Sequence, residues 1–225
     1  MNGVLNIFKP KGMSSFDAVR VVKKVAGTGK VGHTGTLDPE ATGVLPICIG
    51  RATKIIDYIM DSEKVYEVTL KLGIRTTTYD LEGEVLEERD PSHLTEEEIL
   101  NSINSFKGEY SQIPPMYSAL KQNGVRLYEL ARKGIEVERK GRLINIHNLE
   151  DIKINNPYIS MKVTCSKGTY IRSLCYDIGE KLGVFATMTQ LNRAKTSVFS
   201  QEKSININEL TKENINDYIE NPYYY

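Results

Sequence analysis

The sequence has no tryptophan, and it has only three cysteines and three histidines among 225 residues. The cysteines at positions 48, 165 and 175 are too few and too scattered for a disulfide framework or a cysteine zinc site. The histidines at positions 33, 93 and 147 also lack the spacing of metal ligands. We therefore expect reduced thiols and no structural metal.

Long hydrophobic runs are missing as well, since no stretch approaches the roughly 20 apolar residues of a membrane span. The first ten residues lack the apolar core of a signal peptide. Hydrophobic residues make up 40% of the chain and charged residues 26%, which is typical of a soluble globular protein. The length allows one large domain, or one domain with a small appendage. We expect a cytoplasmic protein that does not contact a membrane.

The net charge is zero, but the charges are unevenly distributed. Residues 1–60 carry eight basic and four acidic side chains, and residues 101–195 carry fifteen and eight. Between them, residues 61–100 carry four and twelve, so that an acidic stretch separates two basic ones. This distribution is compatible with a one-sided basic cleft that favours a polyanion. A charge-balanced, solvated surface is the alternative.

Apolar periodicity and turn residues predict a mixture of strands and helices. We expect strands at 4–8, 44–49, 65–72, 143–146, 153–154, 159–164 and 194–199, and a hairpin or surface strand at 80–90. We expect helices at 14–26, 51–60, from 95 onward, 127–132 and 170–182, and a short acidic helix at the end of the chain. Residues 112–118 must be irregular, because they contain two prolines. Strands and helices do not alternate strictly, which favours an α+β fold with a largely antiparallel sheet flanked by helices.

One loop stands out, in which a single carboxylate, Asp38, lies among glycines, small hydroxyls and an imidazole (Gly32–Pro39). Its glycines permit unusual dihedrals and a close approach of backbone to a ligand. Pro39 fixes its own φ and biases Asp38 toward an extended conformation. The loop is therefore suited to hold a nucleophile or a general base in one pose. For an isolated Asp-Pro, an ordinary turn would be the simpler interpretation.

Four blocks, in order along the chain, share a pattern with a known family. They are the Asp38 block Gly32–Pro46, the tyrosine strand Lys64–Val68, the proline-rich block Gln112–Lys121 and the arginine block Ser166–Leu174. Together they make the chain resemble the TruB-type tRNA pseudouridine synthases over nearly all of residues 3–199. The resemblance implies a pseudouridine-synthase-like fold with a central active-site cleft. It also implies conversion of uridine 55 in the tRNA T-loop to pseudouridine, without metal or cofactor.

The resemblance assigns catalytic roles to three residues. Asp38 would be the nucleophile, and attack at C1′, attack at C6 and a glycal route all stay open. Arg172 would pair with Asp38, keep it ionised and aim it through a planar fork. Tyr66 would stack on the uracil and help to move the C5 proton, although periodicity alone would make it a core aromatic.

The same resemblance assigns substrate-binding roles. Leu191 would line the uracil pocket, Tyr170 of the arginine block would contact the substrate, and His33 would fill or prop the place that the extruded base leaves. Plain core packing for Leu191 and a structural imidazole for His33 are the alternatives. Basic side chains are candidates for phosphate contacts, although each one singly is more typical of a solvated charge. They are Lys9, Lys11, Arg20, Lys121, Arg126, Arg132 and Lys167.

The expected domain organisation follows from the extent of the resemblance. Residues 1–200 would form the catalytic domain, with 75–115 as a peripheral insert and 201–225 as a short tail. About 25 residues are too few for the small C-terminal PUA domain that is common in the family. We expect a monomer with tRNA as its partner and no obligate protein partner. A module that only helps tRNA to fold, and an unrelated acid-dependent hydrolase, are the competing hypotheses.

Overall fold

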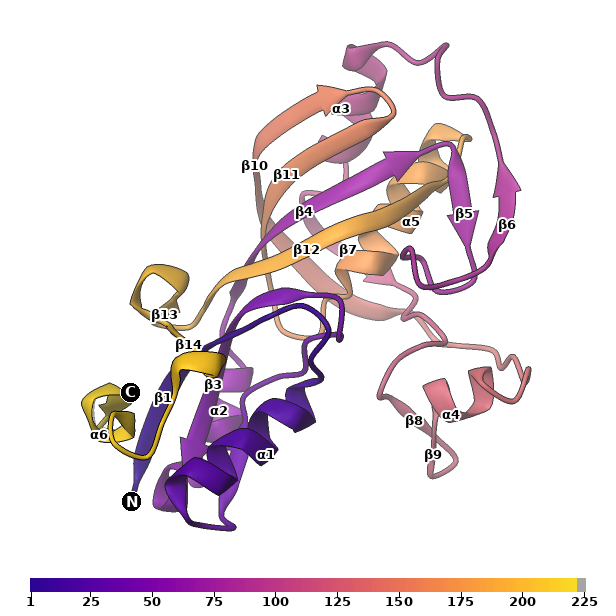
Figure 1. Cartoon of the computed structure of the whole chain (residues 1–225). Coiled ribbons are helices and arrows are strands. Elements are labelled where there is room, and N and C mark those ends of the chain that lie inside the picture. Colours follow the sequence, from indigo (N-terminus) through magenta and orange to yellow (C-terminus); the bar gives the residue numbers. More distant parts are fainter. Residues whose placement is uncertain (222–225) are drawn as a thin grey trace. The chain divides into compact units, whose positions relative to one another are not determined.

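The computed structural model describes residues 1–221, so that residues 222–225, the end of the expected tail, lie outside the described part (Figure 1). The chain divides into two compact units. Unit 1 comprises residues 1–67 together with the chain from Gln190 onward, and unit 2 comprises Val68–Thr189. Two long strands, β4 (Lys64–Leu72) and β12 (Ala186–Thr196), contribute residues to both units.

Unit 1 contains a mixed sheet in which the strands are hydrogen-bonded in the order β14-β1-β3-β12. The pair β1–β3 is antiparallel over its whole length, from Gly3 opposite Ile49 to Lys9 opposite Gly43. The end of β12 pairs parallel with the start of β3, where Asn192 lies opposite Thr42. The strand bounds are β1 (Gly3–Lys9), β2 (Val31–His33), β3 (Thr42–Ile49), β13 (Phe199–Ser200), β14 (Ile205–Asn206) and β15 (Ile219–Glu220).

The first helix of unit 1, α1 (Ser15–Ala26), begins at a complete capping box. The Ser14 hydroxyl accepts from the Asp17 N–H, and the Asp17 carboxylate accepts from the Ser14 N–H, so that two otherwise unpaired donors are satisfied. Gly27, at φ 64°, ends the helix in the left-handed conformation that glycine adopts without strain. Its buried side, with Ala18 and Val22, faces the core. The sequence pattern thus specifies both ends of this helix.

Shorter helices complete unit 1. A 3-10 helix and an α-helix follow β3, and their residues Ala52 and Ile59 pack with Val4, Val44 and Phe199 in one buried cluster. This burial of apolar area, at about 25 cal/mol per Å², holds the segment against the sheet. The bounds are η1 (Gly50–Ile55), α2 (Ile56–Met60), η2 (Gln201–Lys203), η3 (Ile207–Glu209) and α6 (Ile215–Tyr218).

Unit 2 contains the strand order β4-β11-β10-β7. The long strand β10 (Arg142–Asn155) pairs antiparallel with β11 (Tyr158–Cys165) on one side and with β7 (Gly108–Gln112) on the other. Two small hairpins lie beside this sheet. Their strands are β5 (Ile74–Thr76) with β6 (Val85–Glu88), and β8 (Lys121–Gln122) with β9 (Val125–Arg126).

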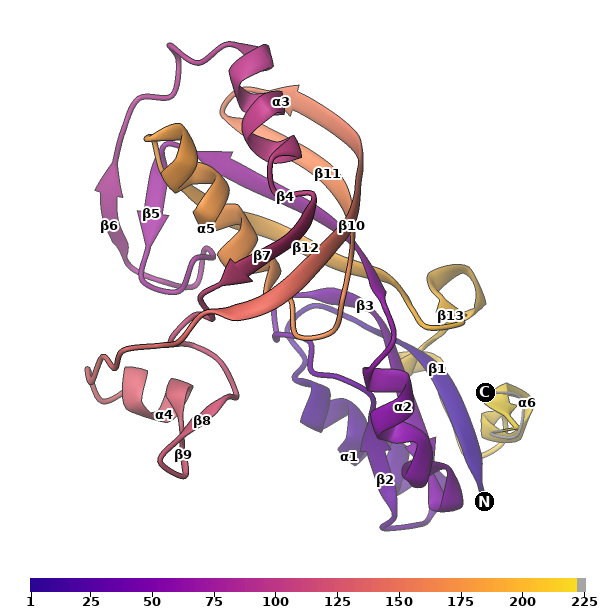
Figure 2. The same ribbon diagram turned by 180° about the vertical axis from the view of Figure 1, so that it is seen from behind.

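Two helices of unit 2, α3 (Glu96–Asn104) and α5 (Ile171–Leu182), pack against each other on the same face of these strands (Figures 1 and 2). Helix α3 begins at the predicted capping box of Thr95 and Glu98. Gly179 lets α5 approach the start of β12 closely, because a Cβ there would lie 2.0 Å from the Ala186 nitrogen. A short helix, α4 (Leu127–Ala131), follows β9.

The predicted α+β class, with a largely antiparallel sheet flanked by helices, is confirmed. Several boundaries were wrong. The strand predicted at 194–199 covers the end of β12 (Ala186–Thr196), a two-residue turn and the first residue of β13, Phe199. The strands predicted at 143–146 and 153–154 are one strand, β10, interrupted by register shifts. The helix predicted at 51–60 is helical throughout, but its first half is a 3-10 helix.

The acidic stretch 80–90, predicted to be a hairpin or a surface strand, contains one exposed strand, β6. This strand pairs antiparallel with β5, which precedes the stretch. Of residues 112–118, which were predicted to be irregular, Gln112 is the last residue of β7, and 113–118 are irregular. Within residues 1–221, no helix combines the length and the apolar character that crossing a bilayer requires.

Candidate active site

The loop that carries Asp38 is fixed by hydrogen bonds on both sides of this residue, all within unit 1. On one side, the Leu37 N–H donates to Ser15 Oγ (2.8 Å), and the same hydroxyl donates to the Leu37 carbonyl (3.0 Å). On the other side, the Gly12 N–H donates to the Pro39 carbonyl (2.8 Å). Leu37 is 3% exposed, whereas Asp38 is half-buried. The backbone is therefore anchored on both sides of the half-buried Asp38, which is the arrangement expected of a nucleophile that is held in one pose.

Lys9 lies beneath this loop. Its side chain is fully buried, and Nζ donates to the carbonyls of Pro10 (3.0 Å), Met13 (2.7 Å) and Pro39 (3.2 Å). Burial lowers the pKa of Lys9 to about 8, and the negative charge of Asp38 acts in the opposite direction. Sequence reasoning expected a phosphate contact here. The structure instead gives Lys9 three backbone carbonyls of the loop and no exposed surface.

Arg193, in β12, is a second buried cation under the loop, and sequence reasoning missed it. It is 1% exposed, and its guanidinium donates to the Val44 carbonyl (2.8 Å) and to the Gly35 carbonyl (3.1 Å). Gly43 is required opposite its backbone, because a Cβ there would lie 2.3 Å from the Arg193 oxygen. One guanidinium thus ties together the two ends of the segment that contains Asp38. In the sequence, the only sign that Arg193 belongs to the site was its position two residues after Leu191.

His33 lies at the end of β2 and is half-buried. Its Nδ1 accepts from the Gly35 N–H (3.2 Å), which requires a neutral ring with its proton on Nε2. Burial, and secondarily the charge of Arg193, lower the pKa of His33 below its usual value. A neutral imidazole in the loop is compatible with the base-replacing role that we predicted.

Tyr66 and Leu191 occupy positions on two strands, β4 and β12, that contribute to unit 1. Tyr66 is 9% exposed and lies on the buried side of β4, as its alternating pattern predicted. Leu191 is half-buried in β12. The next residue, Asn192, donates to Glu67 (2.9 Å) and Gln201 (2.8 Å) and accepts from the Thr42 hydroxyl (3.0 Å). This amide links β12 to β3 and β4 beside the two predicted pocket residues.

Arg172 lies in the first turn of α5 in unit 2 and is 6% exposed. Its guanidinium donates to the carbonyls of Thr78 (3.2 Å) and Tyr117 (2.9 Å). It also forms an ion pair with Asp80 at 3.5 Å, which sequence reasoning missed. Because these partners lie in loops, Arg172 connects the β5–β6 segment and the proline-rich block to α5. The predicted pairing with Asp38 joins residues of different units and stays a prediction.

The turn before Arg172 is fixed by Gln112, which is 2% exposed. Its amide accepts from the Tyr170 N–H (2.8 Å) and donates to the Tyr170 carbonyl (3.1 Å). This reciprocal pair satisfies the backbone of the residue that caps α5. The proline-rich block thus fixes the backbone of the half-buried Tyr170, two residues before Arg172.

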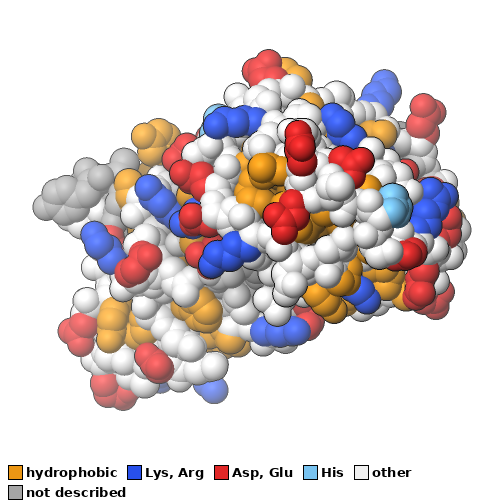
Figure 3. Space-filling view, turned by 90° about the horizontal axis from the view of Figure 1, so that it is seen from above, with side chains coloured by type: hydrophobic (Ala, Val, Ile, Leu, Met, Phe, Trp, Pro, Cys, Tyr) orange, Lys and Arg blue, Asp and Glu red, His pale blue; other side chains and the backbone are white. Residues whose placement is uncertain are grey.

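The other predicted basic contacts lie at the surface. Lys11 is 68% exposed and pairs with Glu40 at 3.0 Å, and Arg20 is 65% exposed and pairs with Asp17. In unit 2, Lys121, Arg126, Arg132 and Lys167 are all exposed. Side chains of both signs are interspersed on the face drawn in Figure 3. The basic cleft that the charge distribution suggested therefore stays a prediction.

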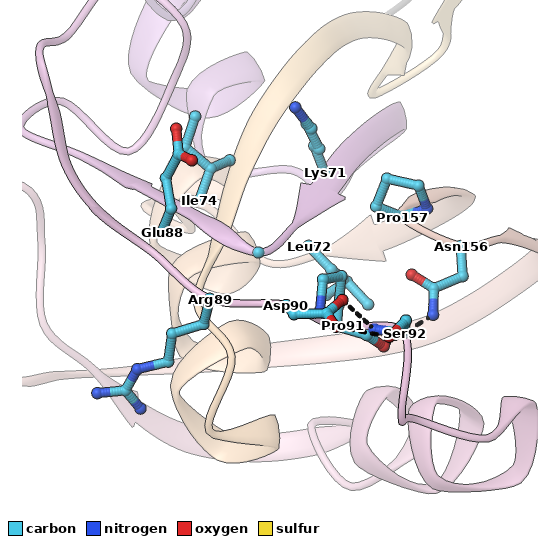
Figure 4. Close-up of a pocket in the computed structure, with 11 residues that line it drawn as sticks. Lys71, Leu72, Ile74, Glu88, Arg89, Asp90, Pro91, Ser92, Asn156 and Pro157 are labelled. Carbon is cyan, nitrogen blue, oxygen red and sulfur yellow. Dashed lines mark hydrogen bonds between the residues drawn. The ribbon is translucent and has the colours of Figure 1, made fainter.

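A pocket of about 530 Å³ lies in unit 2, where Lys71, Arg89 and Asn156 contribute to its lining (Figure 4). The Asn156 amide donates to the Pro91 carbonyl at 2.9 Å. The predicted site residues do not line this pocket. Within residues 1–221, no His, Cys, Asp and Glu side chains are grouped as a metal site would require.

Comparisons with known proteins show the family to which the chain belongs. The TruB family pseudouridylate synthase (N terminal domain) matches residues 23–171, and the tRNA pseudouridylate synthase B C-terminal domain matches residues 172–222. The tRNA pseudouridine synthase B of Clostridium tetani is 63% identical over 97% of this chain and 76% of that protein. The one of Clostridium perfringens (strain SM101) is 66% identical over 97% and 75%. The chain belongs to the TruB family of pseudouridylate synthases.

Solved structures show the same fold. A chain of a Cbf5-Nop10-Gar1 complex superposes with a TM-score of 0.72 at 31% identity and covers 92% of this chain. An H/ACA RNP bound to a substrate RNA containing 2′-deoxyuridine gives a TM-score of 0.69 at 26% identity. This chain spans 53% and 57% of the length of those two chains, respectively.

Proposed function

We propose that the protein isomerises uridine to pseudouridine at position 55 in the T-loop of tRNA. The C1′–N1 bond breaks, the uracil turns, and C5 bonds to C1′, while C5 loses a proton and N1 gains one. The observation that carries the proposal is the Asp38 loop, whose backbone is held by hydrogen bonds on both sides of the half-buried Asp38. Family membership supports the reaction, and the names of the relatives support tRNA as the substrate.

In this proposal Asp38 is the nucleophile, and it acts on a base that has been extruded from its loop. Extrusion costs a few kcal/mol of stacking, which His33 offsets by taking the vacated place. Tyr66 and Leu191 support the uracil, and Tyr170, the residue that caps α5, adds a second aromatic contact. Arg172 pairs with Asp38 and keeps it ionised at neutral pH.

The two buried cations under the loop support this role for Asp38. Lys9 and Arg193 place positive charge on the side of the loop away from solvent, where the low dielectric strengthens their effect on a nearby carboxylate. Both also hold the loop through backbone carbonyls. The same groups therefore supply the position and the charge that a carboxylate nucleophile needs. Because tRNA is the proposed substrate, we place the activity in the cytoplasm.

The direct test is a map of modified positions after the protein is incubated with total unmodified tRNA. We expect pseudouridine at position 55 and at no other uridine of the T-arm. Modification of a different position would overturn the proposed site, and an unmodified tRNA pool would overturn the proposed activity. Affinity for tRNA should fall as salt rises, because phosphate contacts release counterions.

A further inference from the structure

An exposed aromatic ring lies beside the Asp38 loop with a guanidinium over it. Phe16, in the first turn of α1, is 61% exposed. The Arg20 guanidinium carbon lies 5.5 Å from the centroid of this ring, one helical turn further along. Single exposed apolar residues are common on protein surfaces. An exposed aromatic ring that has a cation over it and follows a residue bonded to the Asp38 loop is less common than a single exposed apolar residue, and it suggests a binding role.

The pose of Arg20 is held by a neighbour. The Asp17 carboxylate accepts from the Ser14 N–H (3.1 Å) and the Ser14 hydroxyl, and it also forms an ion pair with Arg20. These hydrogen bonds, those of Ser14 first, lower the pKa of Asp17. The capping box thus fixes the carboxylate, and the carboxylate fixes the guanidinium beside the ring. Because Asp17 already holds Arg20, binding of a ligand to Arg20 costs less side-chain entropy than binding to a mobile arginine would.

The same segment is attached to the catalytic loop. Ser15, next to Phe16, makes both hydrogen bonds to Leu37, and Gly12 bonds to Pro39. The exposed Lys11 lies beside Gly12 and pairs with Glu40. The chain neighbours of Phe16 and Lys11 therefore hold the backbone that presents Asp38, and Arg20 lies over the Phe16 ring.

We propose that Lys11, Phe16 and Arg20, called here the α1 platform, bind an unpaired nucleotide of the RNA next to the target uridine. The inference rests on the proposed function. The ring stacks on the base, as aromatic side chains do with splayed bases in RNA loops. The guanidinium and the ammonium bind the adjoining phosphates. The combination of an aromatic face with two cations favours a nucleotide over an apolar protein segment.

The test is steady-state kinetics on unmodified tRNA with Phe16→Ala and Arg20→Ala, beside the wild type. We expect each variant to raise KM about tenfold and to leave kcat within about twofold, because stacking on a base affects binding and not the chemical step. Phe16→Trp should keep the wild-type KM. Tyr58→Ala is the matched control, since Tyr58 is an equally exposed aromatic (68%) on α2 of the same unit.

Two outcomes would overturn the inference. One is a wild-type KM for Phe16→Ala, and the other is the same rise in KM for Tyr58→Ala. Thermal unfolding of each variant shows whether the fold is kept, and we expect unchanged midpoints because the substituted side chains are exposed. If the wild type forms pseudouridine 55 and Phe16→Ala is indistinguishable from it, the platform fails and the proposed function stands. If the wild type forms none, the proposed function itself fails.

A photo-reactive phenylalanine analogue at position 16 provides a second readout that does not depend on turnover. Irradiation with tRNA should cross-link position 16 to a single T-loop nucleotide other than the target uridine. Cross-links spread over the acceptor stem and anticodon arm would contradict the platform.

Discussion

The carboxylate of Asp80 lies 3.5 Å from the guanidinium of Arg172, and both side chains are at most 10% exposed. Asp80 is itself fixed, because its Oδ1 accepts from the Thr78 hydroxyl and from the Glu82 N–H. A buried guanidinium needs such a counter-charge, and loss of one partner leaves the other desolvated and unpaired. The loop after β5 thereby sets the position of an arginine that lies 92 residues further along the chain.

Replacing Asp80 by Asn should therefore reduce kcat about 100-fold with little change in KM. The shape of the side chain is kept, but the charge that positions Arg172 is lost, and a misplacement of about 1 Å has this magnitude of effect. Glu84→Gln, an exposed acid of the same segment, is the control and should behave as the wild type. Single-turnover rates on unmodified tRNA would measure the change. A rate for Asp80→Asn equal to that of the control would show that the ion pair has no part in the reaction.

Arg172→Lys should lower activity more than RNA binding. Lysine supplies a point charge, but not the planar fork that reaches Thr78, Tyr117 and Asp80 together. We expect kcat to fall by about 100-fold or more, while the dissociation constant for tRNA stays within about threefold. Filter binding and turnover assays on the same preparation would separate the two effects. Equal losses would mean that Arg172 mainly holds RNA.

Burial of Lys9 predicts a characteristic pH dependence of stability. Its pKa is lowered to about 8 in the fold and returns to about 10.5 on unfolding, so that the unfolded chain binds more protons between these values. The Lys9 contribution to the free energy of unfolding should thus rise by about 2 kcal/mol from about pH 7.5 to about pH 9.5. Urea unfolding of the wild type and of Lys9→Met at both pH values measures this rise in the free energy of unfolding.

Lys9→Met should lack this rise, whereas Lys54→Met, at an exposed position of unit 1, should keep it. If the wild type and Lys9→Met show the same dependence on pH, the fold does not lower the pKa of Lys9.

Arg193→Met should raise the pKa of His33. Loss of the guanidinium removes a cation that disfavours the protonated imidazole, while burial continues to lower the pKa. NMR titration of the His33 ring protons in both proteins would detect the shift. The variant should also lose about 1–3 kcal/mol of stability, because the carbonyl of the buried Val44 loses its guanidinium partner. An unchanged pKa would show that Arg193 does not act on the ring.

The sequence predicted the elements with strong local signals. The capping residues of α1 and α3 and the alternation of β4 predicted the observed helices and strand. The Asp38 block was identified because glycine, proline and one carboxylate are informative without any tertiary partner. The start of β12 at Ala186 was missed, because its first three residues, Ala186–Met188, are all buried and so show no alternation.

The sequence did not predict which charged residues are buried. Nothing local distinguishes Lys9, Arg193 or Asp80 from solvated residues, because their burial depends on carbonyls and charges that are far apart in the sequence. Lys9 was accordingly assigned to the surface, and Arg193 and Asp80 were given no role. Such groups become recognisable only when the fold brings their partners together.

The central claim is that Asp38 is the nucleophile of a tRNA pseudouridine synthase. The most direct measurement is the yield of pseudouridine 55 after a long incubation of unmodified tRNA with Asp38→Asn, beside Asp57→Asn, an exposed aspartate of α2, as the control. We predict full conversion by the wild type and the control, none by Asp38→Asn, and equal unfolding midpoints for all three. Conversion by Asp38→Asn would contradict the account.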